Sequence, residues 1–212
     1  MRFDDLTDRL ANRPETLPPP AAGVIPVFTG SPGMRPPATP LDPTAVRPAA
    51  VLVLLFPDES GDARVVLTER VTRDGHHSGE VSFPGGRAEP DDADLAATAL
   101  REAAEEVALD PVAAGVRVIG RLDRFWIPVS NYEVTPVLAL AGREPVLVAS
   151  PNEVASILTP RVSVFLPDAP MEIVDRTIRD WPIRYRAFRV DGRSVWGATA
   201  RILSQLGAIL AD

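Results

Sequence analysis

The stretch "FPGGRAEPDDADLAATALREAAEEVAL", residues 83–109, decides how the rest of this sequence is interpreted. Two glycines are followed by an acidic loop containing a proline, and the spacing then becomes helical. Apolar residues recur at steps of three and four, which predicts a helix over 91–107 with one apolar face. Asp91 is the expected N-cap, because a short acid there accepts hydrogen bonds from the first backbone N–H groups.

Glu102, Glu105 and Glu106 fall within two turns of this helix, with Arg101 beside them. Each like-charged pair costs only ~0.2–0.5 kcal/mol, so the cluster taken by itself favours a solvated helix face over a cation site. The preceding glycines favour the cation site, since they let a backbone carbonyl approach whatever the carboxylates hold. Carboxylate, carbonyl and water oxygens together suit Mg²⁺ or Mn²⁺.

This segment resembles the Nudix box, the glycine–loop–helix motif of diphosphate-cleaving hydrolases. The matching positions in the helix half are Arg101, Glu102, Ala103, Glu105, Glu106 and Leu109. Arg101 lies one residue farther from Gly86 than in the general box, so Asp92 and Asp94 are the acids nearest to its early glutamate. Ala108 stands where the box usually has glycine, and alanine adopts a left-handed turn only at a cost.

The longer loop and an upstream segment resemble the coenzyme A pyrophosphatase branch of the Nudix family. That segment is "LTERVTRDGHHSGEVSFPGG", residues 67–86, in which the matching positions are Leu67, Thr68, Arg70, His77, Gly79, Glu80, Phe83, Pro84, Gly85 and Gly86. A Leu-Arg pair of the branch is replaced by Asp74-Gly75, with only Arg73 nearby. The later "YEVTPVLAL" and "VWGATARIL" also resemble this branch, so the likeness extends from Ala49 to Leu210.

The fold class that the resemblance implies is α/β, a Nudix α/β/α sandwich with a central mixed β-sheet. We expect a proline-rich N-terminal arm over 1–48 and a Nudix hydrolase domain over 49–212. Within the domain, "AVLVLLF" at 50–56 is a continuous apolar run typical of a strand buried on both faces. Interleaved strands and helices are predicted along the rest of the chain. Strands are expected at 64–70, 80–83, 115–122, 132–142, 171–178 and 183–190, and helices at 4–12, 151–158 and 195–210.

The resemblance also implies the roles of the site residues. The catalytic set is Glu102, Glu105, Glu106 and Arg101, of which the three glutamates and the Gly85 carbonyl hold divalent ions and Arg101 keeps a carboxylate aimed. The substrate-binding set is Arg70, His77, Glu80, Phe83 and Tyr132.

Several of these residues have a second interpretation that the sequence leaves open. Glu80 is either a ligand or base of the site or an exposed strand residue, and His77 either contacts phosphate or is a solvated loop residue. Trp126, Asn131 and Tyr132 either stack on adenine or belong to the core. Asp92, Asp94 and Glu153 are expected to be acids at helix starts, where the helix dipole favours them.

The expected reaction is metal-dependent hydrolysis of a diphosphate linkage, with Mg²⁺ or Mn²⁺ as cofactor and no covalent intermediate. Coenzyme A or its thioesters are the implied substrates, yielding adenosine 3′,5′-bisphosphate and (acyl-)4′-phosphopantetheine. The altered loop at Asp74-Gly75 keeps other nucleoside diphosphate derivatives open, including ADP-ribose, NADH or a nucleoside triphosphate. A non-catalytic nucleotide-binding module and a scaffold that docks a partner through its arm are the rivals from other classes.

Composition limits the remaining function classes. A net charge of −7 argues against a general nucleic-acid surface, and no apolar run approaches the ~20 residues of a membrane span. With Cys 0, disulfide and thiolate chemistry are excluded. The N-terminus "MRFDDLTDRL" is acidic and polar, unlike a secretory signal. We therefore expect a cytoplasmic protein with a small-molecule substrate, no nucleic-acid or membrane partner, and a homodimer as one allowed assembly.

Overall fold

The apolar run predicted as a buried strand forms β2 (Arg47–Pro57), the strand around which the main sheet is built. The computed structural model describes residues 1–31, 37, 39–71, 80–178 and 180–211. Side chains of β2 alternate between two separate cores: Ala49, Val53 and Leu55 lie in one, whereas Ala50, Leu52 and Leu54 lie in the other. Because successive residues of a strand point to opposite faces, this continuous apolar run fills both sides of the sheet, as predicted.

The main sheet is mixed and six-stranded. Its strand order is β3 (Ala63–Val65), β2, β9 (Tyr132–Ala141) and β7 (Val116–Arg121), with β6 (Gly85–Arg87) also paired to β2 and β8 (Phe125–Ile127) also paired to β9. The pair β2–β9 is parallel and the other pairs are antiparallel. The strands β6 and β8 therefore lie on opposite edges of the same end of the sheet.

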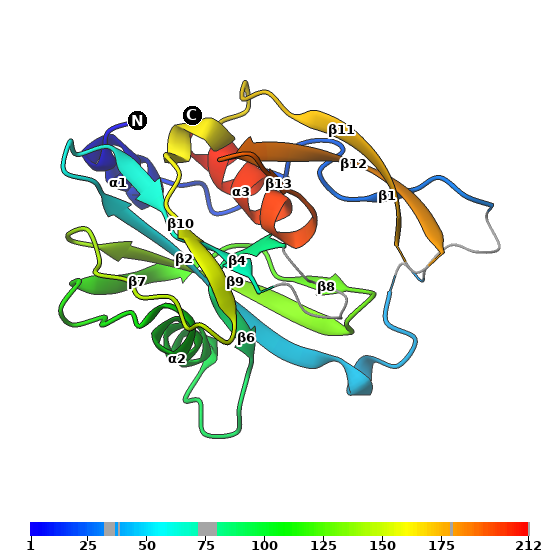
Figure 1. Cartoon of the computed structure of the whole chain (residues 1–212), viewed down its shortest axis with the longest axis horizontal. Helices are drawn as coiled ribbons and strands as arrows, with labels where there is room; N and C mark the ends of the chain where they lie inside the picture. The colour runs from blue at the N-terminus through cyan, green and yellow to red at the C-terminus, as the bar shows by residue number, and fades with distance from the viewer. Residues whose placement is uncertain (32–36, 38, 72–79, 179, 212) are drawn as a thin grey trace.

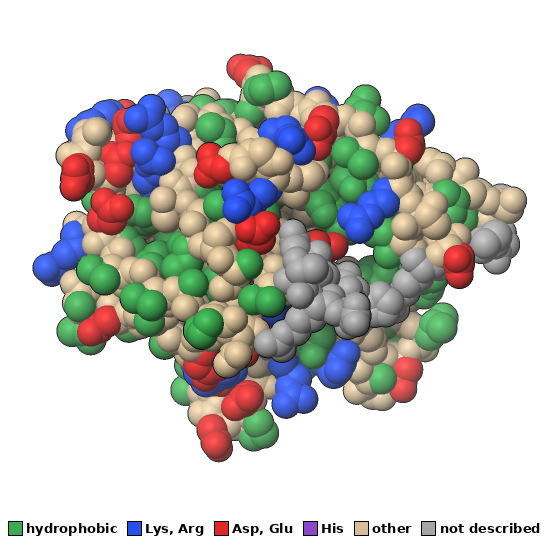
Figure 2. Space-filling model, viewed as in Figure 1, with side chains coloured by type: hydrophobic (Ala, Val, Ile, Leu, Met, Phe, Trp, Pro, Cys, Tyr) green, Lys and Arg blue, Asp and Glu red, His purple; other side chains and the backbone are tan. Residues whose placement is uncertain are grey.

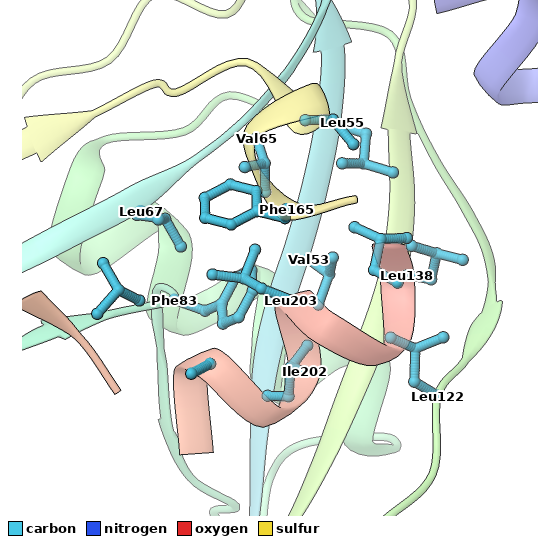
Figure 3. Close-up of a cluster of buried hydrophobic side chains, with 14 of the residues drawn as sticks. Val53, Leu55, Val65, Leu67, Phe83, Leu122, Leu138, Phe165, Ile202 and Leu203 are labelled. Carbon is cyan, nitrogen blue, oxygen red and sulfur yellow. The ribbon is translucent and has the colours of Figure 1, made fainter. Parts of the chain in front are cut away.

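Two helices cover the two faces (Figure 1). The apolar face of α2 (Leu95–Val107) packs on Leu52, Leu54 and Val137, whereas α3 (Gly197–Ile209) buries Leu203 and Leu206 in the core of the opposite face. Figure 3 shows this second core, in which Leu203 and Phe165 lie over Val53 and Leu138. The predicted α/β/α sandwich with a mixed central sheet is confirmed.

The described residues also form two smaller sheets. One has the order β10 (Val154–Leu158), β4 (Leu67–Arg70) and β5 (Val81–Ser82). The other has the order β1 (Val27–Phe28), β12 (Trp181–Val190) and β11 (Glu172–Ile178), with β13 (Arg193–Val195) paired to β12. Asp191 and Gly192 both have positive φ in the turn between β12 and β13, as expected of an Asp-Gly hairpin.

The helix predicted at 151–158 is wrong, because most of that segment is β10. Val154 and Leu158 are buried as the strand pairs with β4 in antiparallel register, and Ser156 bonds to Glu69. The stretch contains β-branched residues, and pairing with a distant strand outweighs the weak local helical preference.

The helix N-cap is also corrected, because α2 begins four residues later than predicted. Asp94, not Asp91, accepts hydrogen bonds from the backbone N–H groups of Ala96 and Ala97. At the other end, Ala108 caps the helix in the left-handed conformation, with φ 52 and ψ 35. The chain thus adopts a turn there that glycine would adopt without strain.

The N-terminal segment shares the core of the domain. It includes α1 (Phe3–Ala11), whose Leu6 and Leu10 are fully buried together with Val24. Gln205 of α3 donates a hydrogen bond to the Pro18 carbonyl, so the segment also runs along this helix. The division of the chain at residue 48 stays a prediction. Figure 2 shows acidic and basic side chains interspersed over one face, and none of the described helices has the length and hydropathy of a membrane span.

Candidate active site

The glutamates of α2 meet the glycine turn at the end of the sheet. Glu106 is the most enclosed of the three, with its side chain 5% exposed, and its Oε2 accepts a 3.2 Å hydrogen bond from the Gly85 N–H. The Glu102 carboxylate lies directly against the α-carbon of Gly86, where any side chain would collide with it. Since β6 pairs with β2 at this point, the two glycines let the backbone approach both carboxylates closely.

Arg101 holds the other two glutamates from the side. Its Nη1 donates to Glu102 Oε1 at 3.1 Å and to both oxygens of Glu105 at 3.3 Å. Its remaining nitrogens are occupied by Asp92, which accepts from Nε at 3.0 Å and from Nη2 at 3.1 Å. The predicted role of Arg101, aiming a carboxylate of the helix, agrees with this geometry.

Asp92 is itself fixed by the loop that precedes α2. Its carboxylate also accepts hydrogen bonds from Thr98 Oγ1 at 2.8 Å and from the Glu89 N–H at 2.9 Å. The Arg101 guanidinium, helped by these two donors, holds the pKa of Asp92 well below its usual range. Asp92 is therefore a fixed anion that orients Arg101, a more specific role than the helix-start acid expected from the sequence.

Burial and like charges make the ionised form of Glu106 costly. Burial raises the pKa of Glu106 to about 7, against the opposing effects of Arg70 and the Gly85 N–H. The carboxylates of Glu102 and Glu153 add to this rise. The pKa of Glu102 is also raised, first by burial and then by Glu105 and Glu153, although Arg101 opposes the shift. A divalent cation between these groups would relieve both the desolvation and the repulsion.

The donor set fits a hard divalent ion in chemical kind, because it consists of clustered carboxylates beside a backbone turn. The ligand arrangement is not preformed: among the described residues, no three side chains of ligand-forming type are gathered tightly enough to hold a metal. Arg101 bonds to Glu102 and Glu105, and Arg70 and the Gly85 N–H contact Glu106. A bound metal ion would thus replace the two arginines and the Gly85 N–H as partners of these oxygens.

Of the predicted substrate-binding residues, Arg70 lies beside the carboxylates. Arg70 is the last residue of β4, and its Nη2 lies 3.7 Å from Glu106 Oε1 while the side chain is 43% exposed. The backbone of Glu80 lies beside the end of β4, because the Arg70 N–H donates to the Glu80 carbonyl at 3.0 Å. His77 lies outside the described residues, as does the Asp74-Gly75 substitution.

The aromatic residues proposed to contact substrate make contacts with other residues of the protein. Phe83 is only 2% exposed and packs in the core under α3, so its burial contradicts the predicted direct contact with substrate. Tyr132 is half-buried at the start of β9 and is covered by the Arg47 guanidinium, 4.2 Å from the ring centroid. Trp126 Nε1 donates to Asn131 Oδ1, a contact that stabilises the turn between β8 and β9.

Comparison with protein families places residues 46–177 within the NUDIX domain. The chain belongs to the Nudix family. It is 36% identical over 179 residues to Nudix hydrolase 15, mitochondrial, of Arabidopsis thaliana, a match that covers 79% of this chain and 61% of that protein. It is 37% identical over 165 residues to the uncharacterized Nudix hydrolase NudL of Citrobacter koseri, covering 76% and 81%. The chain thus spans about three fifths of the plant relative's length.

Solved Nudix structures show more distant likenesses. The NUDIX domain of Shewanella oneidensis NrtR, in complex with ADP ribose, is 19% identical with a TM-score of 0.44, covering 57% of this chain and 79% of that one. A MutT/nudix family protein from Enterococcus faecalis is 17% identical with a TM-score of 0.48, covering 82% and 64%.

Sequence reasoning expected Glu153 to be an acid at a helix start, which is wrong because the residues that follow it form the strand β10. Glu153 lies in the turn before β10, and the register Val154↔Arg70 brings it beside the end of β4. Its carbonyl accepts a hydrogen bond from the Val71 N–H, and its charge acts on both Glu102 and Glu106. Local sequence gave no signal, since the position of Glu153 depends on pairing between segments far apart in the chain.

Proposed function

We propose that this chain hydrolyses a diphosphate linkage in a nucleoside diphosphate derivative, using divalent metal ions at the carboxylates of α2. Nudix hydrolases generally use such ions. The observation that carries the proposal is Glu106, a buried carboxylate with a pKa raised to about 7, beside Glu102 and the Gly85-Gly86 turn. Burying acids together in this way lowers stability unless a bound cation compensates.

The residues of the chain supply binding and orientation for this reaction. Arg70 presents a partly exposed guanidinium next to Glu106 and is suited to bind an oxygen of the diphosphate. Arg101 and Asp92 keep Glu102 and Glu105 on the same side of α2. Bound divalent ions would neutralise charge on the diphosphate oxygens and lower the pKa of a bound water.

In the net reaction, a water oxygen forms a bond to one phosphorus while the bridging P–O bond breaks. The bridging oxygen leaves with the electron pair on the other phosphate, and the protons of water end on the products or in solvent.

We further propose coenzyme A or its thioesters as the substrate, giving adenosine 3′,5′-bisphosphate and (acyl-)4′-phosphopantetheine. Support comes from the segment at 67–86 and from the longer loop before α2, both of which resemble the coenzyme A pyrophosphatase branch. In the structure this loop carries Asp92, which accepts two hydrogen bonds from Arg101. ADP-ribose, NADH and nucleoside triphosphates are the alternative substrates, since Asp74-Gly75 departs from that branch.

Product analysis tests both levels of the proposal. Purified protein is incubated with CoA, acetyl-CoA, NADH and ADP-ribose in Mg²⁺ or Mn²⁺, and the products are separated by chromatography and identified by mass. Release of adenosine 3′,5′-bisphosphate from CoA supports the full proposal. Cleavage of another substrate with CoA left intact would reject CoA as the substrate but support diphosphate hydrolysis. If no substrate is cleaved, both proposals are contradicted.

The cytoplasmic location and the homodimer remain predictions. Size-exclusion chromatography with light scattering decides the assembly, because a dimer of this 22.8 kDa chain would elute at twice that mass.

A further inference from the structure

Two exposed arginines lie next to the glycine turn of the candidate site. Arg87 is the last residue of β6 and follows Gly86 directly, and Arg47 is the first residue of β2. Among the described residues, no carboxylate lies within ion-pair distance of either guanidinium. Both cations are therefore open to solvent and available to an anionic ligand.

The carboxylates of α2 meet β6 at an open edge of the sheet. Two backbone hydrogen bonds fix which residues of β6 face β2: Leu52 N–H to the Pro84 carbonyl at 2.8 Å, and Ala88 N–H to the Pro48 carbonyl at 3.0 Å. Hydrogen-bonded and non-hydrogen-bonded pairs alternate along an antiparallel ladder, so the N–H and C=O groups of Gly85 and Arg87 point away from β2. Glu106 accepts the Gly85 N–H there, and Arg101 donates to the Arg87 carbonyl at 3.0 Å. A ligand held at this edge is accessible from either face of the sheet.

The two arginine side chains lie on the face that α3 covers, but beyond the part that it covers. Arg47 and Ala49 share this face because they are two residues apart on β2, and Arg87 is directly opposite Ala49. Ala49 is 6% exposed in the core under α3, whereas both arginines are exposed. The helix therefore leaves this end of the sheet open to solvent. In Figure 2, basic side chains accordingly appear over the start of β2, which Figure 1 locates.

Arg47 is held by its neighbours and keeps donors free. Its Cζ lies 4.2 Å from the centroid of the Tyr132 ring, and its Nη2 donates to the Ser130 carbonyl at 2.7 Å. Its Nε and Nη1 donate to no acceptor in the described part of the chain. The guanidinium is thus oriented before a ligand arrives, which lowers the entropic cost of binding.

The spacing suits a phosphate that lies one ribose away from the diphosphate. Gly85 and Arg87 are two residues apart on a strand, so their Cα atoms are about 7 Å apart. Arg87 and Arg47 differ by one strand and two residues, which places their Cα atoms roughly 8 Å apart. Their long side chains can therefore converge on one group beside the glycine turn. In a nucleoside with a 5′ diphosphate and a 3′-phosphate, the ribose alone separates the two groups.

We propose that Arg87 and Arg47 together bind a phosphomonoester on the ribose of the substrate, beside the diphosphate that is cleaved. Two guanidinium forks match the oxygens of one phosphate. This inference rests on the proposed function and deepens it: for CoA the group bound is the 3′-phosphate, whereas NADH and ADP-ribose carry no phosphate besides the diphosphate. Tyr132 then acts as the support on which Arg47 lies.

The test uses Arg87→Met, Arg47→Met and the double variant, which keep an apolar chain and remove the donors. Turnover of CoA is compared with turnover of 3′-dephospho-CoA. We expect kcat/KM of the double variant for CoA to fall about 10- to 100-fold, chiefly through KM, since charge-assisted hydrogen bonds to the phosphate are lost. Each single variant should lose part of this. Selectivity for CoA over 3′-dephospho-CoA should fall by the same factor, and unchanged selectivity would overturn the proposal.

A binding measurement separates this inference from the proposed function. Titration calorimetry compares adenosine 3′,5′-bisphosphate with AMP, and needs no turnover. Wild type should prefer the bisphosphate, and the double variant should lose that preference. If CoA is not cleaved but the preference is lost in the variant, the CoA assignment fails and the two-arginine site stands. If wild type shows no preference, or the variant keeps it, the site fails whatever happens to CoA.

Arg117→Met is the matched control. Arg117 is an exposed arginine of β7, opposite Leu140 of β9, and within the described residues it has no ion-pair partner. Leu140 is eight residues along β9 from Tyr132, roughly 27 Å away. This variant loses the same charge far from the site, so its preference for the bisphosphate should equal that of wild type. A matching loss in the control would contradict a specific role of Arg87 and Arg47. Thermal unfolding of all variants shows whether a change in binding occurs in folded protein.

Discussion

The buried Glu106 carboxylate should make the metal-free protein less stable as the pH rises. The pKa of Glu106 in the folded state is about 7, against an ordinary value of 4.5. Between these values the folded protein holds a proton that the unfolded chain has released. Stability therefore falls as pH rises through this window and levels off above about pH 7. At 1.36 kcal/mol per pKa unit, the difference corresponds to about 3 kcal/mol.

Glu106→Gln removes this effect. Glutamine is neutral at every pH and keeps an acceptor oxygen for the Gly85 N–H. At pH 5 we expect the free energies of unfolding of variant and wild type to differ by less than about 1 kcal/mol. At pH 8 the variant should be more stable by up to about 3 kcal/mol. The same substitution should lower turnover by orders of magnitude, so stability and proposed activity change in opposite directions.

Urea unfolding followed by tryptophan fluorescence, with chelator present, measures the effect at pH 5, 6, 7 and 8. Glu105→Gln is the control, because that side chain is 56% exposed and its removal should change stability by no more than about 1 kcal/mol at any pH. If the free energy of unfolding of Glu106→Gln changes between pH 5 and pH 8 in the same way as that of wild type, the ionised Glu106 carboxylate does not destabilise the folded protein, and the prediction is refuted.

Three further predictions concern the loop and the ends of α2. Gly86→Ala should displace the Glu102 carboxylate and lower kcat, with little change in melting temperature. In Gly85→Ala the new methyl group would collide with the Ala50 carbonyl, so this variant should have a lower melting temperature. The opposite pattern in thermal unfolding and activity assays would contradict the geometry. Ala108→Gly should raise the free energy of unfolding by about 1 kcal/mol, because the left-handed φ of 52 suits glycine; chemical denaturation measures this, and a loss of stability would refute it. Asp92→Asn should reduce turnover roughly 10- to 100-fold, because Arg101 loses a partner that fixes its position. Asp91→Asn is the control, and equal turnover of the two variants would show that Asp92 orients nothing needed for the reaction.

Those parts of the fold that depend on local periodicity could be predicted from the sequence. The apolar run that became β2 and the helical spacing of α2 both specify which faces are buried, and two separate cores confirm it. The glutamates of α2 were identifiable for the same reason, because residues three and four apart on a helix share a face.

Features that depend on pairing between distant segments could not be predicted. The segment 151–158 became a strand because β4 pairs with it, and the same pairing brings Glu153 to the site. Asp92 looked like one of several acids at a helix start until the loop placed it against Arg101. Ala108 was recognised as a departure from glycine, and the structure shows that the backbone nevertheless keeps the glycine-like turn.

The most direct test of the central claim is the mass of the products formed from CoA in the presence of Mg²⁺ or Mn²⁺. Wild type should release adenosine 3′,5′-bisphosphate and 4′-phosphopantetheine, chelator should stop the reaction, and Glu106→Gln should be nearly inactive while remaining folded. Equal product formation by wild type and Glu106→Gln, or undiminished cleavage in chelator, would contradict a metal-dependent diphosphatase site on α2.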